Sequence, residues 1–316
     1  MAALRTALPV VLALCAALSN ALATVLQRKA ALTVPRSPGL RAGLMLDLLR
    51  RPVWLAGMLA VIAAAVCQAA ALATGPLTVV QPLFVLELPL TLVAAAVLLH
   101  RRLPGRGWLA VGTVVAGLAV ALAAASPTGN RTDVPPDRWI PALAVCSGTV
   151  VVLALAALRR PEGRARAACL GAATAIGYAM TAALMKSSTH ALDERGLLGF
   201  LSAWQTYAFA ATGVCALFLL ENAMQAGPLV ASQPALTLGD AAVSLVLGIT
   251  LYEEAVRAGW WLVPQLCGVA LIVAGVVTLA RTPLARTLVA QDRQEQRGVV
   301  PAGRQEPPPV SGGDQT

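Results

Sequence analysis

Nine long runs of apolar residues follow one another along this chain of 316 residues. A helix that crosses the hydrocarbon core of a bilayer needs about 20 mostly apolar residues, and each run has about that length. Strands of an outer-membrane barrel would instead alternate apolar and polar residues over about ten positions. The sequence therefore predicts an all-α polytopic membrane protein. We expect its nine transmembrane helices over residues 7–27, 53–74, 77–99, 107–125, 139–158, 167–185, 198–220, 229–250 and 260–280.

Charged residues are too few to cover a soluble protein of this size. They make up 12% of the chain, against about 25% in an ordinary soluble domain. The formal net charge is +9, but a basic protein that binds nucleic acid would spread such charge over a wet surface. Composition therefore excludes nucleic acid as a partner and indicates the lipid bilayer. The sequence has no HExxH, Walker or GxSxG motif, so we expect neither an enzyme nor a bound cofactor.

The basic residues alternate between the two sides of the membrane. Eighteen of the 24 Lys and Arg residues lie in the tail and in the loops after the first, third and fifth spans. Cytoplasmic loops hold the excess of Lys and Arg, so the chain is predicted to lie in the cytoplasmic membrane with its N-terminus outside and its C-terminus in the cytoplasm. The first run could instead be a cleavable signal peptide ending near residues 21–23. We favour a retained helix because the apolar run continues to Leu26 and ends at residues 27–29, QRK.

Two stretches of the sequence are similar to each other. Five of nine residues are identical between residues 75–83 (GPLTVVQPL) and residues 227–235 (GPLVASQPA). The two stretches open the third and the eighth span, an odd number of spans apart, so the two halves would face opposite ways, as in many secondary transporters. The predicted organisation is two inverted four-helix repeats joined by a linker helix. We expect the first repeat over 1–127, the linker helix and its loops over 128–166, the second repeat over 167–281 and a disordered cytoplasmic tail over 282–316.

Two carboxylates fall deep within apolar spans. Glu87 lies twelve residues after Gly75, and Asp240 lies thirteen residues after Gly227, so the two occupy similar depths in the two repeats. A charge at the centre of a membrane helix costs about 2.5–3.5 kcal/mol, which argues for a role. We expect Glu87 and Asp240 to face a central cavity and to bind a cation, a metal ion included, or to carry protons. The alternative is a pair of protonated carboxyls that only join helices by hydrogen bonds.

Further polar residues follow the faces of the same helices. Residues three or four positions apart share a helix face, and a polar face in the bilayer must contact protein or water. Ser and Thr that join helices by hydrogen bonds are the alternative explanation. Three stripes result, namely Gln233, Thr237, Asp240 and Ser244, then Asn20, Thr24 and Gln27, and finally Thr174, Tyr178 and Thr181. The residues expected to line a substrate path beside the carboxylates are Gln81, Gln233, Thr237, Asn20 and Thr24.

Prolines interrupt the third and the eighth span. Proline lacks a backbone N–H and frees a carbonyl one turn earlier. Freed carbonyls could coordinate a cation, or the bent helices could flex during transport, whereas kinks that serve packing alone are the alternative. The residues expected to break these helices are Pro76 and Pro82, assisted by Pro89, and Pro228 and Pro234.

Two polar groups at the outer ends of spans are expected to be solvated. Lys186, His190 and residues 193–195 indicate an exposed loop after the sixth span. Glu253 and Glu254 follow the eighth span. These two carboxylates could gather cations, although a solvent-exposed loop is the simpler interpretation.

Short motifs at three places carry a family resemblance. They are residues 54–57 (WLAG), residues 73–83 (ATGPLTVVQPL) and residues 220–224 (LENAM). With these motifs the chain resembles the drug/metabolite transporter superfamily and, within it, the NIPA-type magnesium transporters. The resemblance implies inverted repeats of short helices and Mg²⁺ as substrate, for which Glu87 and Asp240 could supply hard oxygen ligands. Two positions of the second span depart from the magnesium-transporter pattern and carry Ala65 and Gln68.

These features together predict a secondary transporter that moves a small solute or a divalent cation, Mg²⁺ included, by alternating access between the two repeats. The coupling ion, a proton or the divalent cation itself, is left open, and so is a homodimer. The alternative from a different class is a membrane scaffold or accessory subunit that transports nothing. In that protein the intramembrane carboxyls would only hold helices together.

Overall fold

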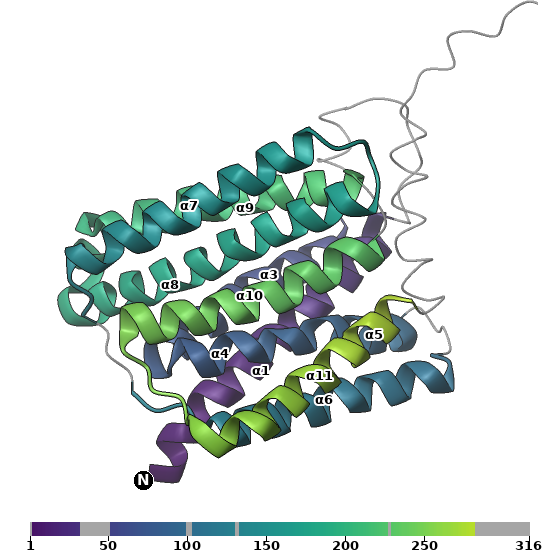
Figure 1. Cartoon of the computed structure of the whole chain (residues 1–316), viewed down its shortest axis with the longest axis horizontal. Coiled ribbons are helices and arrows are strands. Elements are labelled where there is room, and N and C mark those ends of the chain that lie inside the picture. The colour runs from purple at the N-terminus through teal and green to yellow at the C-terminus, as the bar shows by residue number, and fades with distance from the viewer. Residues whose placement is uncertain (1, 32–50, 99–102, 130–132, 227–228, 282–316) are drawn as a thin grey trace, which may run out of the picture.

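The computed structural model describes residues 2–31, 51–98, 103–129, 133–226 and 229–281 (Figure 1). A few side chains near the edges of these segments, that of Gln233 among them, lie outside the description. The regular secondary structure of the described part is helical, apart from one isolated β-bridge between Thr128 and Ala255. Its helices are α1 (Ala2–Ala31), α3 (Pro52–Thr74), α4 (Leu77–Leu83), the 3-10 helix η1 (Phe84–Leu86), α5 (Glu87–Leu98), α6 (Gly105–Ala125), α7 (Pro136–Leu158), α8 (Arg164–Ser202), α9 (Trp204–Ala226), α10 (Leu229–Tyr252), the 3-10 helix η2 (Gly259–Trp261) and α11 (Leu262–Ala280).

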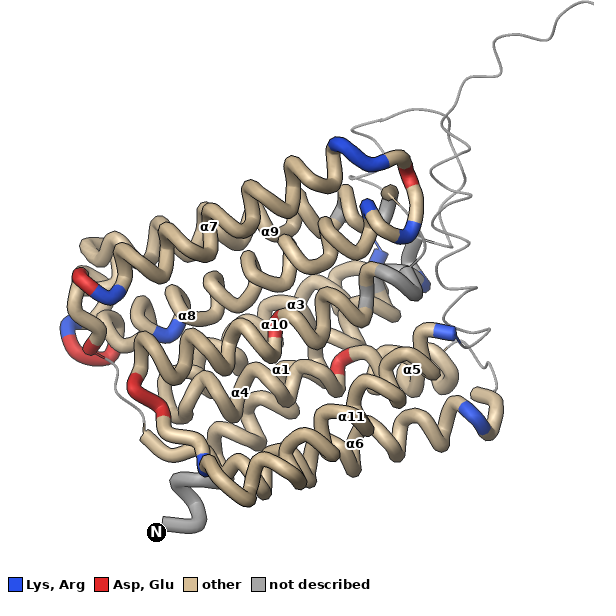
Figure 2. The backbone as a smooth tube through the Cα atoms, viewed as in Figure 1, with Lys and Arg blue, Asp and Glu red and all other residues tan. Residues whose placement is uncertain are grey.

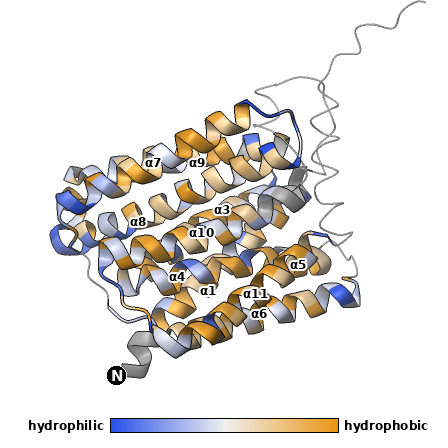
Figure 3. Ribbon diagram, viewed as in Figure 1, coloured by the Kyte–Doolittle hydropathy of each residue, from blue (hydrophilic) through white to orange (hydrophobic). Residues whose placement is uncertain are grey.

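The described helices have the lengths that a bilayer requires. Eight of them, with α4, η1 and α5 taken as one rod, are long and apolar enough to cross a membrane. In α9 the apolar part is shorter and covers Trp204–Leu220. Hydrophobic residues run along the helices (Figure 3). Many large apolar side chains are exposed, for example Leu109 at 74%, as is expected where lipid replaces water. The prediction of an all-α polytopic membrane protein is confirmed.

The sixth predicted span is wrong at its end. The sequence predicts its end at residue 185, but α8 continues through Lys186 to Ser202, with a break in helical geometry at Gly196 (φ 65°). The polar run Lys186-Ser187-Ser188 lowers the hydropathy at this point, yet all three residues are buried. These residues are therefore part of the bundle and not of a solvated loop.

The rod that starts at α4 is interrupted beside two of its prolines, whereas α5 continues through Pro89. Pro76 is in extended geometry directly before α4, and Pro82 lies inside α4, just before the 3-10 turn that leads into α5. In the second half, α10 continues through Pro234, and Pro228 is outside the described residues. This broken rod carries residues of the candidate site and sets their positions.

The charges gather at the two ends of the bundle (Figure 2). Lys and Arg collect where α6 begins, α7 ends and α8 begins, and we call this the basic end. Acidic and basic residues mix at the opposite end, where α7 begins and α10 ends. Two acidic positions lie away from both ends, at the start of α5 and within α10.

Two helices of the bundle touch through their backbones. Gly117 of α6 faces Gly268 of α11, and a Cβ on Gly117 would lie 2.7 Å from the Gly268 carbonyl oxygen. A Cβ on Gly268 would lie 2.6 Å from the Gly117 carbonyl oxygen. Small residues let membrane helices approach this closely, so the paired glycines set the distance between α6 and α11.

We predict that Gly117→Ala destabilises the protein, because its methyl group would clash with rigid backbone. Overpacking of this kind costs about 1–3 kcal/mol. The matched control is Gly112→Ala on the same helix, where a Cβ would meet nothing within 4 Å. Since alanine favours a helix over glycine, the melting temperature of the purified protein in detergent should stay level or rise for the control and fall for Gly117→Ala. Equal melting temperatures would show that the two helices do not touch at Gly117.

Candidate functional site: a carboxylate-lined central cavity

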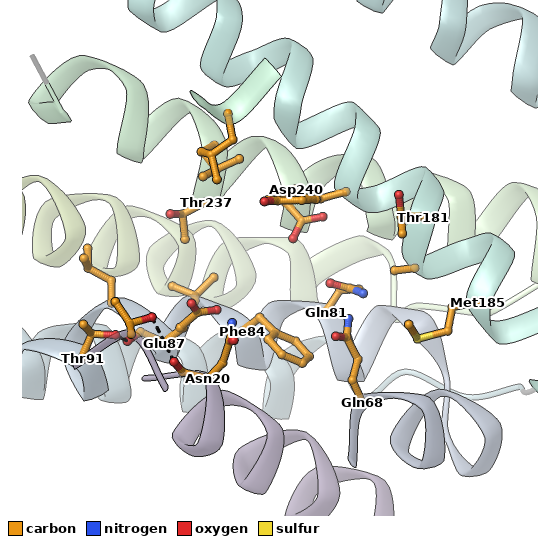
Figure 4. Close-up of a pocket in the computed structure, with 17 residues that line it drawn as sticks. Asn20, Gln68, Gln81, Phe84, Glu87, Thr91, Thr181, Met185, Thr237 and Asp240 are labelled. Atoms are coloured by element: carbon orange, nitrogen blue, oxygen red, sulfur yellow. Dashed lines mark hydrogen bonds between the residues drawn. The ribbon is translucent and has the colours of Figure 1, made fainter. Parts of the chain in front are cut away.

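A cavity of about 530 Å³ lies between the helices (Figure 4). Side chains from α1, α3, α8, α9, α10 and the broken rod of α4, η1 and α5 form its wall. Apolar groups such as Phe84, Met185 and Leu220 complete this wall. Its polar members are Asn20, Thr24, Gln68, Gln81, Glu87, Thr91, Tyr178, Thr181, Thr237 and Asp240.

Glu87 is held at the point where the broken rod resumes as a regular helix. It is the first residue of α5, directly after the 3-10 turn. A carboxylate in the first turn of a helix interacts favourably with the helix dipole. The Asn20 side chain of α1 hydrogen-bonds the Glu87 carboxyl. The helix break and Asn20 together position this carboxylate in the cavity wall.

Asp240 comes from the facing wall. Figure 4 shows it on α10, across the cavity from Glu87 and Asn20. The buried Ser244 hydroxyl, one turn further along α10, donates a hydrogen bond to Asp240 Oδ1 over 3.3 Å. The two carboxyls are close enough to interact electrostatically. A positive charge between them would relieve the repulsion between two ionised carboxylates.

Two glutamine amides add neutral polar groups to the wall. Gln68 reaches the cavity from α3 and Gln81 from α4. Gln81 is 3% exposed, and its Nε2 atom has no hydrogen-bond partner among the described residues. A buried polar group without a partner costs about 1–3 kcal/mol. The Gln81 amide is therefore available to whatever enters the cavity.

The structure brings together most of the residues that the sequence singled out. Asn20, Thr24, Gln81, Glu87, Thr237 and Asp240 all line the one cavity, whereas the side chain of Gln233 lies outside the described residues. Sequence reasoning did not select Gln68 as a site residue, although a glutamine inside an apolar span was a usable signal. The apolar wall members carry no such signal, because they look like any other core residue.

The oxygen ligands that the cavity offers are two carboxylates and several neutral groups. In the part of the chain that the structure describes, no group of three or more His, Cys, Asp or Glu side chains could hold a metal. Glu87 and Asp240 offer carboxylate oxygens, and the amides and threonines offer weaker oxygen ligands. Such a wall suits a cation that keeps part of its water shell, which is the usual behaviour of Mg²⁺.

A second charged group lies near the cavity, and for Lys186 and Glu254 the expectation of a solvated position is wrong, whereas residues 193–195 are exposed as expected. Lys186 and Glu254 side chains are fully buried, and Lys186 Nζ lies 2.7 Å from Glu254 Oε1. The Glu254 carboxylate also accepts the backbone N–H groups of Leu77 (2.7 Å) and Thr78 (2.8 Å), at the start of α4. The ammonium lies 4.5 Å from the centre of the Tyr252 ring. We call this group the Lys186–Glu254 cluster.

The chain reversal after α10 explains how Glu254 becomes buried. Glu253 adopts φ 51°, a left-handed conformation that turns the chain back on the helix end. The Glu254 N–H then bonds the Gly248 carbonyl oxygen over 3.0 Å. A Cβ on Gly248 would lie 2.5 Å from Glu254 Oε2, so the glycine leaves room for the carboxylate. Glu253 itself stays half-exposed and pairs with Arg138, so only one of the two glutamates is solvated.

The cavity and the cluster lie at different depths in the bundle. The cluster binds the first residues of α4, at the opposite end, whereas Gln81 lies one turn further in and lines the cavity. Thr24 and Leu220 lie in the halves of α1 and α9 nearer the basic end, and Thr91 lies on α5, which continues the broken rod toward that end. The Ala226 carbonyl oxygen accepts the Gly163 N–H, which fixes the end of α9 beside the start of α8. The cavity therefore extends toward the basic end, and the cluster lies on its other side, at the opposite end.

A polar, carboxylate-bearing cavity between membrane-spanning helices is typical of proteins that move an ion or a solute, and comparison with known proteins agrees with the class of membrane transporters. The family described as Magnesium transporter NIPA matches residues 5–136. An uncharacterised protein of Corynebacterium glutamicum is 33% identical over 287 residues, which cover 89% of this chain and 95% of that protein. No solved structure matches the chain. The chain belongs to the NIPA-type magnesium transporter family.

We predict that Lys186 and Glu254 stabilise the protein as a pair. Removal of one partner from a buried ion pair costs about 3–5 kcal/mol, so Glu254→Gln and Lys186→Met should each lower the melting temperature markedly. The double variant leaves no uncompensated charge, and its loss of stability should be smaller than the sum of the two single losses.

The control for this cycle is Glu253→Gln, which removes the neighbouring glutamate. Glu253 is half-exposed, and surface ion pairs contribute little to stability, so this variant should melt close to the unmodified protein. Additive effects of Glu254→Gln and Lys186→Met would contradict a coupled pair.

Proposed function

We propose that this protein transports a divalent cation, Mg²⁺ first of all, through the central cavity, with Glu87 and Asp240 as the binding carboxylates. One observation carries the proposal: two carboxylates from different helices face one cavity that also holds amides and hydroxyls. Ionisable residues inside membrane bundles typically mark substrate or ion pathways. Membership of a magnesium transporter family supports the choice of ion.

The size of the cavity supports a hydrated ion. Mg²⁺ gives up its water reluctantly and is commonly held by one or two carboxylates together with several waters. Six waters occupy about 180 Å³ at the volume they have in the liquid, and the cavity has about 530 Å³. Asn20, Gln68 and Gln81 can accept hydrogen bonds from such waters through their amide oxygens. A small organic solute would also fit the volume, and the experiment below separates the two.

The direction of the cavity supports alternating access. Cytoplasmic segments of membrane proteins carry the excess of Lys and Arg, so we assign the basic end to the cytoplasm, with the N-terminus outside, in a cell membrane. On this assignment the cavity extends toward the cytoplasm and is closed toward the outside. The helix packing is compatible with inverted repeats, because α1 packs on α3 as α8 packs on α9, and α6 packs on α11. The second half would then rock against the first, with the proton or the cation itself as coupling ion.

We predict that Glu87→Gln and Asp240→Asn each reduce Mg²⁺ flux by about tenfold or more, since tenfold corresponds to about 1.4 kcal/mol of lost binding. The measurement is Mg²⁺ uptake into proteoliposomes that contain a fluorescent Mg²⁺ indicator. Gel filtration of each variant shows that it is folded. The matched control is Glu194→Gln, an exposed carboxylate of α8 outside the cavity.

Each outcome of this experiment selects one function. Flux that depends on Glu87 and Asp240 but not on Glu194 supports the proposal. Wild-type flux in folded Glu87→Gln and Asp240→Asn would refute the site. If the unmodified protein passes no Mg²⁺ but accumulates a small organic solute, the cavity serves that solute. If it passes nothing and a stable partner co-purifies, the scaffold alternative holds.

A further inference from the structure

We propose that the Lys186–Glu254 cluster is the gate that closes the cavity at the opposite end of the bundle, and that this ion pair separates when the cavity opens there. The proposal rests on the transport role proposed above. It assigns a function to two buried charges that line no part of the cavity and that stability alone does not require.

The cluster lies on the same segments that form the cavity wall. Met185 lines the cavity, and the next residue along α8 is Lys186. Gln81 lines the cavity one turn after Leu77 and Thr78, whose N–H groups bind Glu254. Movement of the cluster therefore changes the shape of the cavity directly.

On this proposal, the tight packing of the cluster blocks the way out of the cavity at the opposite end. Tyr252 is fully buried beside Lys186, and its hydroxyl bonds Ser187 over 2.9 Å. Leu77, Leu184 and Leu251 around it are fully buried as well. These groups come from α4, α8 and the end of α10, so one compact contact joins the three segments and excludes water.

The seven-residue helix α4 can transmit the state of the gate to the site. It is bounded by Pro76 on one side and by the 3-10 turn Phe84–Leu86 on the other. Such interruptions are where helices bend. Glu87 follows the turn directly. If Glu254 releases the start of α4, the tilt of this short segment moves Gln81 and Glu87 together, which couples the gate to the binding carboxylates.

An ion pair serves a gate better than an apolar plug does. Apolar side chains of similar volume are often as stabilising as a buried ion pair, or more so, so stability alone does not explain the charges. Once separated, Lys186 and Glu254 can each be hydrated, which lowers the cost of an open, water-filled state. The Thr78 hydroxyl is buried without a hydrogen-bond partner among the described residues, and it too would gain partners when water enters.

Cysteine labelling from each side of the membrane tests the gate. The six native cysteines are replaced by alanine, and Met185→Cys is introduced as the reporter, with Thr181→Cys as a second reporter in the same cavity wall. A membrane-impermeant maleimide is applied to right-side-out and to inside-out membrane vesicles. While the Lys186–Glu254 ion pair is intact, we expect both reporter cysteines to react slowly with maleimide applied to the side of the membrane where the opposite end of the bundle lies.

Glu254→Gln and Lys186→Met should each raise labelling from that side by about tenfold or more, the change that about 1.4 kcal/mol in the closed-to-open equilibrium produces. Glu253→Gln, which alters the adjacent exposed glutamate, should leave labelling unchanged. A cysteine at the fully buried Ala173 reports on unfolding and should stay unlabelled throughout.

Two results would overturn the gate. One is unchanged labelling of both reporters in both pair variants. The other is an equal rise at Ala173→Cys and at the reporters, because general loosening would then explain the accessibility. Labelling requires no Mg²⁺, so the test is independent of the substrate. If the protein passes no Mg²⁺ but the pair variants still show side-specific labelling, the result supports the gate and refutes only the proposed ion.

Discussion

The bond between the Glu254 carboxylate and the start of α4 is the interaction on which the rest of the site depends. A helix that begins inside a membrane protein has backbone N–H groups that water cannot satisfy, and here Glu254 accepts two of them. Lys186 compensates the charge. With its first turn fixed, α4 holds Gln81 in the cavity wall and leads through the 3-10 turn to Glu87.

The buried charged side chains of the bundle have two different kinds of hydrogen-bond partner. Lys186 and Glu254 neutralise each other and add no net charge to the interior. Glu87 and Asp240 instead have neutral hydrogen-bond partners, the Asn20 amide and the Ser244 hydroxyl. When both carboxylates are ionised, the cavity wall carries two uncompensated negative charges. One divalent cation would neutralise them. This contrast is what the two proposals use, with the paired charges for closure and the carboxylate pair for binding.

The sequence predicts well how deep a residue lies within a membrane span. It predicts much less well which other residues that residue contacts. Nine apolar runs predicted the helices, and the depth of Glu87 and Asp240 within their spans selected two residues that share one cavity. Hydropathy predicts the wrong helix end at Lys186. A lysine after an apolar run looks like the end of a span as long as its buried ion-pair partner is unknown. Its partner Glu254 is 68 residues away, and it becomes buried only through the chain reversal at Glu253. Gln68 is absent from the predicted site for a related reason, because its neighbours in the cavity come from other helices.

The central claim is that Glu87 and Asp240 bind one divalent cation together. Isothermal titration of Mg²⁺ into the purified protein tests it most directly, with the double variant Glu87→Gln/Asp240→Asn and the control Glu194→Gln alongside. The claim predicts about one Mg²⁺ bound per chain in the unmodified protein and in the control, and no binding in the folded double variant. The same stoichiometry and affinity in all three proteins would contradict it.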